Sequence, residues 1–145
     1  MSDDTQHLLV SAWGAYSEIE PGLWMGACPP EEAPDFADAI LDVYARHEYA
    51  RGACAYRGEP MLDFAELPDP ELLDSLVRWV HEHREHGRTV LIHCQAGQNR
   101  SGLITALYLI RYREFRPQAA IDLIQEKRGP NALWNGSFVR YLLAS

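Results

Sequence analysis

Residues 93–102 read His93-Cys94-Gln95-Ala96-Gly97-Gln98-Asn99-Arg100-Ser101-Gly102, in which five residues separate a cysteine from an arginine. The apolar run Val90-Leu91-Ile92 precedes this stretch, and a second apolar run from Leu103 to Ile110 follows it. The pattern predicts a strand that leads into a short loop, and a helix that begins where the loop ends. The backbone N–H groups of such a loop and of the helix N-terminus point to one spot, so the stretch predicts an anion-binding site.

The side chains of this loop indicate which anion it binds. Cys94 would lie at the base of the loop, where the N–H groups stabilise a thiolate and so make a nucleophile. Arg100 carries a planar guanidinium that fits two oxygens of a phosphate group, and Gly97 permits the tight curvature of the backbone. An ionised thiol in a phosphate-shaped loop predicts transfer of a phosphoryl group to the cysteine.

These residues resemble the active-site loop of the cysteine-based protein phosphatases, which have His-Cys, five residues and then Arg-Ser or Arg-Thr. The small dual-specificity branch of that family is the most similar. Its opening segment is similar to Ile19-Glu20-Pro21-Gly22-Leu23-Trp24-Met25-Gly26, and the Asn-x-x-Phe of its last helix resembles Asn135-Gly136-Ser137-Phe138. With the segment Arg128-Gly129-Pro130-Asn131-Ala132-Leu133, the chain resembles bacterial or phage members of the branch.

The resemblance implies an α/β domain with the protein tyrosine phosphatase-like fold, in which one central mixed β-sheet is flanked by helices. The single domain would span residues 1–145, with residues 1–18 as a partly ordered lead-in. The pattern of apolar residues predicts strands over residues 23–26, 40–44 and 89–93, a strand end over 61–64, a loop or weak strand over 51–60, and a short helix or loop over 31–39. Strands that alternate with helices and then give way to helices alone are typical of this fold class.

Helices are predicted over residues 70–86, 101–113, 117–127 and 135–143. The first has clear end signals, because Asp69 is a suitable N-cap, Pro70 suits the first helical position and Gly87 is a natural stop. The helix over 101–113 is apolar almost all round, which predicts a central, buried position. Tryptophans are usually core residues, and we expect this of all four: Trp13, Trp24, Trp79 and Trp134.

Composition limits the other functional classes. The chain has 145 residues, of which 47% are hydrophobic, and this suits one globular domain. A net charge of −8 disfavours binding to nucleic acid or to an anionic membrane, and no apolar run is long enough to span a bilayer. Three cysteines are too few for a disulfide framework, so we expect a cytoplasmic, monomeric protein. No cofactor or metal is expected, because His81, His83 and His86 lack the spacing of a zinc site.

The resemblance implies a role for each residue of the loop. Cys94 attacks phosphorus and forms a phosphocysteine, Arg100 and the loop N–H groups bind the phosphate oxygens, and Ser101 donates a hydrogen bond to the sulfur of Cys94. For Ser101 the alternative is a helix N-cap. The phosphate-binding set is Gln95, Ala96, Gly97, Gln98, Asn99 and Arg100. His93 is expected to point away from the phosphate and to organise the loop.

Two assignments stay open. The leaving oxygen needs a proton from a general acid, which the family supplies as an aspartate on a separate upstream loop. Asp63 is preferred, with Asp69 and Glu66 as alternatives, and Asp69 already has a structural role as helix cap. Asn135 either bonds the backbone near the active-site loop or simply caps the last helix.

The favoured function is hydrolysis of phosphomonoesters, namely phosphotyrosine and also phosphoserine or phosphothreonine, so the partner is a phosphoprotein or a small phosphomonoester. An RNA 5′-triphosphatase fits Gly97-Gln98-Asn99-Arg100-Ser101-Gly102, but the acidic composition argues against it. A phosphoinositide phosphatase is disfavoured because Gln95 and Gln98 are neutral, and a rhodanese-like sulfur transferase because of the loop spacing. The retained cysteine and arginine argue against a phosphate-binding protein without activity.

Overall fold

The computed structural model describes residues 14–63 and 66–145. Trp13, Phe64 and most of the expected lead-in lie outside the described residues. The described strands are β1 (Tyr16–Glu20), β2 (Leu23–Gly26), β3 (Ala39–Asp42), β4 (Ala55–Gly58) and β5 (Val90–His93). The described helices are α2 (Pro70–Glu85), α3 (Arg100–Tyr112), α4 (Pro117–Arg128) and α5 (Gly136–Leu143).

The strands form one five-stranded mixed sheet in the order β1-β2-β5-β3-β4. Only β1 runs antiparallel to its neighbour, and the other four strands are parallel to one another. Gly26 of β2 and Asp42 of β3 are both in register with His93 of β5, so the carboxyl ends of the three strands meet at one edge. The loop that follows β5 therefore starts where open α/β sheets bind their ligands.

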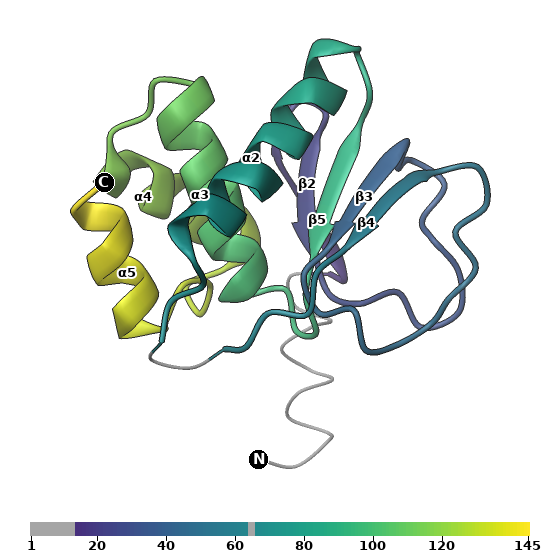
Figure 1. Ribbon diagram of the computed structural model, residues 1–145, viewed down its shortest axis with the longest axis horizontal. Coiled ribbons are helices and arrows are strands. Elements are labelled where there is room, and N and C mark those ends of the chain that lie inside the picture. Colours follow the sequence, from purple (N-terminus) through teal and green to yellow (C-terminus); the bar gives the residue numbers. More distant parts are fainter. Residues whose placement is uncertain (1–13, 64–65) are drawn as a thin grey trace.

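The two faces of the sheet are covered differently. All four labelled helices lie on one side of the sheet in Figure 1, where Leu41 and Ile92 pack into the main core with α3. The other face is covered by the segments between β2 and β3 and between β3 and β4, which supply Phe36, Ala37 and Tyr49. Leu91 of β5 packs against this second cluster. The α/β fold predicted from the sequence is thus confirmed, and the helices that the structure describes cover a single face.

Helix α3 is the central helix of the fold. Every residue from Ser101 to Leu109 is buried, and the helix contacts α2, α4, α5, β2 and β5. A helix that is apolar on all sides avoids water only in such a central position. No helix in the described part of the chain is both long and apolar enough to cross a bilayer.

Three local predictions were wrong. Residues 16–18, expected in the lead-in, belong to β1, which pairs with β2 and so satisfies the backbone of both. Residues 61–63 form no strand, because the N–H of Met61 bonds Val43 and its carbonyl accepts from the Arg100 side chain. Trp134 is not a core residue: it is 64% exposed.

The start of α2 gives a test of helix capping. The Asp69 carboxylate accepts a hydrogen bond of 2.8 Å from the N–H of Glu71. Replacing Asp69 with alanine leaves that donor without its partner, and we expect the free energy of unfolding to fall by about 1 kcal/mol. Urea titration measures the change. Asp69→Asn is the matched control, because it keeps the acceptor oxygen and should keep most of the stability; equal losses in both variants would contradict the cap.

Candidate active site

The loop between β5 and α3 keeps its carbonyl oxygens on its outer side. The carbonyl of Gln95 accepts from the N–H of Cys28 at 3.1 Å, and that of Gln98 from the N–H of Leu133 at 3.2 Å. The carbonyls of Ala96 and Gly97 accept from a buried arginine. Within the described part of the chain, the backbone N–H groups of residues 95–99 have no acceptor. These donors are the groups that the sequence predicts for binding an oxyanion.

Arg128, at the end of α4, is the arginine that holds two of these carbonyls. Its side chain is 6% exposed, and it donates from Nε to the carbonyl of Gly97 at 3.0 Å and from Nη2 to that of Ala96 at 3.3 Å. Its Nη1 donates to the carbonyl of Gly14 at 2.8 Å and to Oγ of Ser17 at 3.1 Å. Sequence reasoning missed this role, although a charged residue on the buried stripe of α4 with Ile121 and Ile124 was a usable signal.

Gly97 is required for two separate reasons. Its φ of +72° lies in the left-handed region that side chains disfavour. A Cβ at this position would also lie 2.6 Å from the carbonyl oxygen of Gly26 and 2.7 Å from the nitrogen of Ala27. The loop at Gly97 therefore packs directly on the backbone at the end of β2, with no room for a side chain between them.

Cys94 lies at the base of the loop and is only 2% exposed. Its Sγ is 3.4 Å from Oγ of Ser101, which is within hydrogen-bond reach for sulfur. Ser101 is the second residue of α3, and Asn99 occupies the N-cap position. The hydroxyl of Ser101 is thus placed to interact with the sulfur, and it is not the helix cap.

Arg100 reaches across to the segment before α2. Its Nη1 donates to the carbonyl of Met61 at 3.1 Å, and its Cζ lies 5.4 Å from the centre of the Tyr44 ring. Its Nε is buried and has no hydrogen-bond partner among the described residues. A buried donor without a partner carries a free-energy cost, and a bound oxyanion would remove that cost.

The ring of His93 is bonded to groups outside the loop interior. The imidazole is fully buried, with Nδ1 at 3.1 Å from the carbonyl of Cys94 and Nε2 at 2.6 Å from the Tyr49 hydroxyl. A carbonyl only accepts, so Nδ1 carries the hydrogen. Burial lowers the pKa of His93, with a smaller opposing effect from the Asp42 carboxylate, and favours the neutral ring. Nε2 then accepts from Tyr49, whose pKa burial raises.

Asp42 is a fully buried carboxylate behind the loop, and sequence reasoning missed it. It accepts from the Tyr56 hydroxyl at 2.7 Å and from the N–H groups of Tyr44 and Ala45 at 3.1 and 2.7 Å, and it lies 3.7 Å from Nε2 of His93. A signal was present, because Asp42 and His93 both end apolar strands. Parallel strands bring such terminal polar residues to one edge.

The structure brings Asp63, Asn99 and Asn135 together. Oδ2 of Asp63 accepts from Nδ2 of Asn99 at 3.0 Å, and Oδ1 accepts from Nδ2 of Asn135 at 2.8 Å. The backbone N–H of Asn135 donates to Oδ1 of Asn99 at 2.9 Å. Asn135 also caps α5, since its Oδ1 accepts from the N–H groups of Ser137 and Phe138. The asparagine thus links α5 to the loop through Asn99 and also holds Asp63.

The two alternatives to Asp63 lie elsewhere. Asp69 caps α2, and Glu66 is exposed beside an apolar groove that Leu67 and Leu72 line. Neither carboxylate has a hydrogen bond to the loop in the described part of the chain. The geometry therefore favours Asp63 over both.

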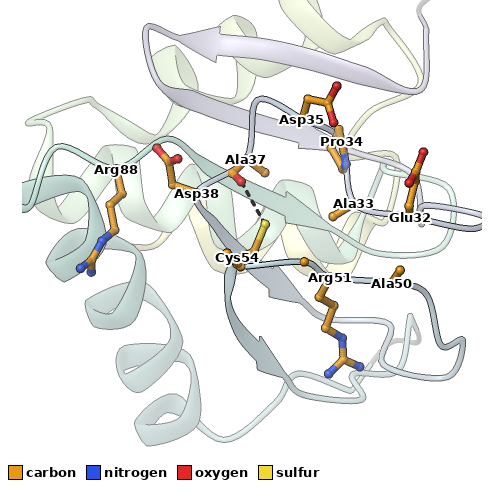
Figure 2. A pocket seen from close by; sticks show the side chains of 12 residues that line it. Glu32, Ala33, Pro34, Asp35, Ala37, Asp38, Ala50, Arg51, Cys54 and Arg88 are labelled. Carbon is orange, nitrogen blue, oxygen red and sulfur yellow. Dashed lines mark hydrogen bonds between the residues drawn. The ribbon is translucent and has the colours of Figure 1, made fainter.

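A separate pocket of about 740 Å³ lies at the opposite edge of the sheet (Figure 2). Asp38, Cys54 and Arg88 line it, and they come just before β3, β4 and β5. The thiol of Cys54 donates to the carbonyl of Ala37 there. None of the predicted site residues lines this pocket, so it is distinct from the loop that holds Cys94.

Comparison with known proteins places these features in a family. A family model described as dual specificity phosphatase, catalytic domain, matches residues 37–145. The chain is 28% identical to rat dual specificity protein phosphatase 12 over 138 residues, and 27% identical to human dual specificity protein phosphatase 2 over 139 residues. These matches cover 88% of this chain but only 40% and 44% of the two relatives, so the chain spans less than half of their length.

The fold also has close solved counterparts. A crystal structure of a mouse putative dual specificity phosphatase complexed with zinc tungstate matches with a TM-score of 0.81. The match covers 90% of this chain and 85% of that one, at 20% sequence identity. At this identity the likeness supports the fold alone, and it agrees with the sheet and helices described above.

The packing of Gly97 against β2 gives a test of the loop. We expect Gly97→Ala to lower the free energy of unfolding by about 2–5 kcal/mol, because a left-handed alanine and a backbone clash add. Gly52→Ala is the matched control: Gly52 has a φ of +59°, and a Cβ there meets nothing within 4 Å. The control should lose roughly 1 kcal/mol from the backbone conformation alone. Urea titration of both variants compares them, and equal losses would contradict the close contact.

Arg128 gives a test of how the carbonyls are held. Arg128→Lys keeps the charge but loses the fork that reaches both carbonyls. We expect the free energy of unfolding to fall by about 2–4 kcal/mol and the affinity for inorganic phosphate to fall at least about tenfold. Calorimetric titration with phosphate measures the affinity. Arg128→Met removes the charge as well as the fork, and its affinity for phosphate should not exceed that of Arg128→Lys. Phosphate affinity in the lysine variant equal to that of the wild type would refute the role.

Proposed function

The chain belongs to the dual specificity phosphatase family, and we propose that it hydrolyses phosphomonoesters of proteins through a phosphocysteine intermediate at Cys94. The proposed substrates are phosphotyrosine and also phosphoserine and phosphothreonine. The observation that carries the proposal is the position of the Cys94 sulfur, at the base of a loop whose carbonyls are all held outward. A phosphate group over this sulfur would meet N–H donors on all sides of its three outer oxygens.

In the first step the thiolate of Cys94 attacks phosphorus. The S–P bond forms while the bond between phosphorus and the ester oxygen breaks. The leaving oxygen takes a proton from Asp63, which two asparagine amides hold beside the loop. The loop N–H groups and the guanidinium of Arg100 stabilise the charge on the outer oxygens, which is usually the largest single contribution to catalysis of this kind.

In the second step a water molecule attacks the phosphocysteine. Asp63, now ionised, accepts a proton from the water, and inorganic phosphate is released. The electron pair of the breaking S–P bond returns to sulfur, where the Ser101 hydroxyl at 3.4 Å stabilises it.

The proposed setting follows from the same residues. All three cysteines are free thiols, and a catalytic thiolate needs a reducing compartment such as the cytoplasm. An acid beside the loop and a net charge of −8 both favour a phosphomonoester over an RNA triphosphate as substrate.

Hydrolysis of p-nitrophenyl phosphate in the presence of EDTA tests the mechanism. We expect activity in the wild type and a loss of at least about 10³-fold in Cys94→Ser, because a hydroxyl is not ionised at neutral pH. Asp63→Ala should be about 10²-fold slower, because the leaving oxygen then departs without a proton donor.

The matched controls are the other two acids of the same segment. Glu66→Ala and Asp69→Asn should keep the wild-type rate. A normal rate in Asp63→Ala, together with a reduced rate in either control, would move the acid to that residue. An inert wild type would reject the phosphomonoesterase proposal.

A further inference from the structure

Trp134 is the most exposed of the large hydrophobic side chains in the described part of the chain. It is 64% exposed, whereas the next, Leu62, is 53% exposed. A large apolar side chain in water has a free-energy cost, and a lone one needs no explanation. Trp134 differs because other groups fix its position in three ways.

The first is a direct bond to the loop. The indole Nε1–H of Trp134 donates to Oε1 of Gln98 at 3.0 Å, and the N–H of Leu133 donates to the backbone carbonyl of the same glutamine at 3.2 Å. Two consecutive residues are therefore attached to one residue of the phosphate loop. The indole has one polar atom, and the loop uses it, which leaves the apolar ring surface for other contacts.

The second is a strained backbone just before the tryptophan. Leu133 has a φ of 58°, in the left-handed region that a leucine disfavours. Its side chain is 2% exposed and packs on Gly102 at the start of α3, where a Cβ would lie 2.8 Å from Cγ of Leu133. This conformation turns Leu133 inward and Trp134 outward. Strain of this kind persists only where the surroundings enforce it, and it gathers at functional sites.

The third is the residue that follows. Asn135 donates from Nδ2 to the carboxylate of Asp63 at 2.8 Å. Trp134 thus lies between a residue of the phosphate loop on one side and the partner of the proposed acid on the other. In the proposed reaction the leaving group lies in this same region between the phosphate loop and Asp63. Its oxygen is bonded to phosphorus and must also reach Asp63 to receive a proton.

From this placement we propose that the Trp134 indole forms a wall at the mouth of the phosphate site and packs against the organic group of the substrate. Among organic groups, an aromatic ring gains the most binding free energy from contact with the indole. The chain therefore prefers aryl phosphates such as phosphotyrosine over alkyl phosphates such as phosphothreonine. The inference rests on the proposed function and names its preferred substrate class. Trp134 acts here as a specificity-determining residue and takes no part in the bond changes.

Binding of non-hydrolysable analogues tests the wall without any turnover. Benzylphosphonate has the geometry of an aryl phosphate with CH₂ in place of the bridging oxygen, ethylphosphonate has that of an alkyl phosphate, and inorganic phosphate has no organic group. We expect Trp134→Ala to raise the dissociation constant of benzylphosphonate about three- to tenfold. The dissociation constants of ethylphosphonate and of phosphate should stay within about twofold of the wild type. Isothermal titration calorimetry measures all three.

Two further variants serve as controls. Trp134→Phe keeps a ring but loses the bond to Gln98, and it should retain most of the affinity for benzylphosphonate. Tyr112→Ala removes another exposed aromatic residue at the far end of α3, about 18 Å from Arg100 along the helix, and should change nothing. An unchanged benzylphosphonate affinity in Trp134→Ala, or an equal loss for all three ligands, would overturn the proposal.

Kinetics on two peptides of one sequence, phosphorylated on tyrosine or on threonine, separates this inference from the proposed function. A fall in kcat/KM of Trp134→Ala that is confined to the phosphotyrosine peptide supports both. Equal effects on the two peptides, with an active wild type, would reject the wall and leave the phosphatase in place. A wild type that binds benzylphosphonate through Trp134 but hydrolyses neither peptide would reject the phosphatase and leave the wall in place.

Discussion

The carbonyl oxygens of residues 95–98 each accept a hydrogen bond from outside the loop that they belong to. A peptide unit is planar and its C=O and N–H point in opposite directions, so a carbonyl held outward leaves the next N–H directed inward. The backbone donors of this loop are thus oriented by partners in other parts of the chain: Cys28, Leu133 and Arg128. The anion site depends on this outer set of bonds, and Arg128 contributes two of them while it is itself bonded to Gly14 and Ser17.

Much of this architecture is predictable from local sequence. The helix that begins at Pro70 has a cap before it and a glycine after it, and the structure places its bounds within one residue of the prediction. The loop follows from a cysteine, a glycine and an arginine at fixed spacing between two apolar runs. The general-acid candidate Asp63 follows Met61, whose N–H bonds Val43 just after β3, and β3 is the neighbour of β5 in the sheet. Asp63 therefore lies beside the loop that follows β5. The strand pattern predicts one sheet but does not give the order of its strands.

The remainder depends on contacts between residues far apart in the chain. Asp42 is a buried carboxylate whose partners, Tyr56 and His93, lie 14 and 51 residues away, and the sequence links it to His93 only through their shared position at the end of an apolar strand. For Trp134 the prediction was wrong in the other direction, since a residue expected in the core is exposed. Tryptophans are usually buried, but the left-handed backbone of Leu133 turns Trp134 outward. Residues 61–63 resemble a strand in sequence, but their backbone groups bond single partners, Val43 and Arg100, in place of a ladder.

The two hydrogen bonds that the side-chain amides of Asn99 and Asn135 donate to Asp63 have a kinetic consequence. Asn99 adjoins the loop and Asn135 caps α5, so the carboxylate is attached to the same body that carries the cysteine. In the proposed reaction the proton donor is then in position before substrate arrives, and Asp63 does not have to move into place between binding and bond cleavage. The conformational entropy of placing this group is lost once, when the chain folds, and it adds nothing to the barrier of each turnover.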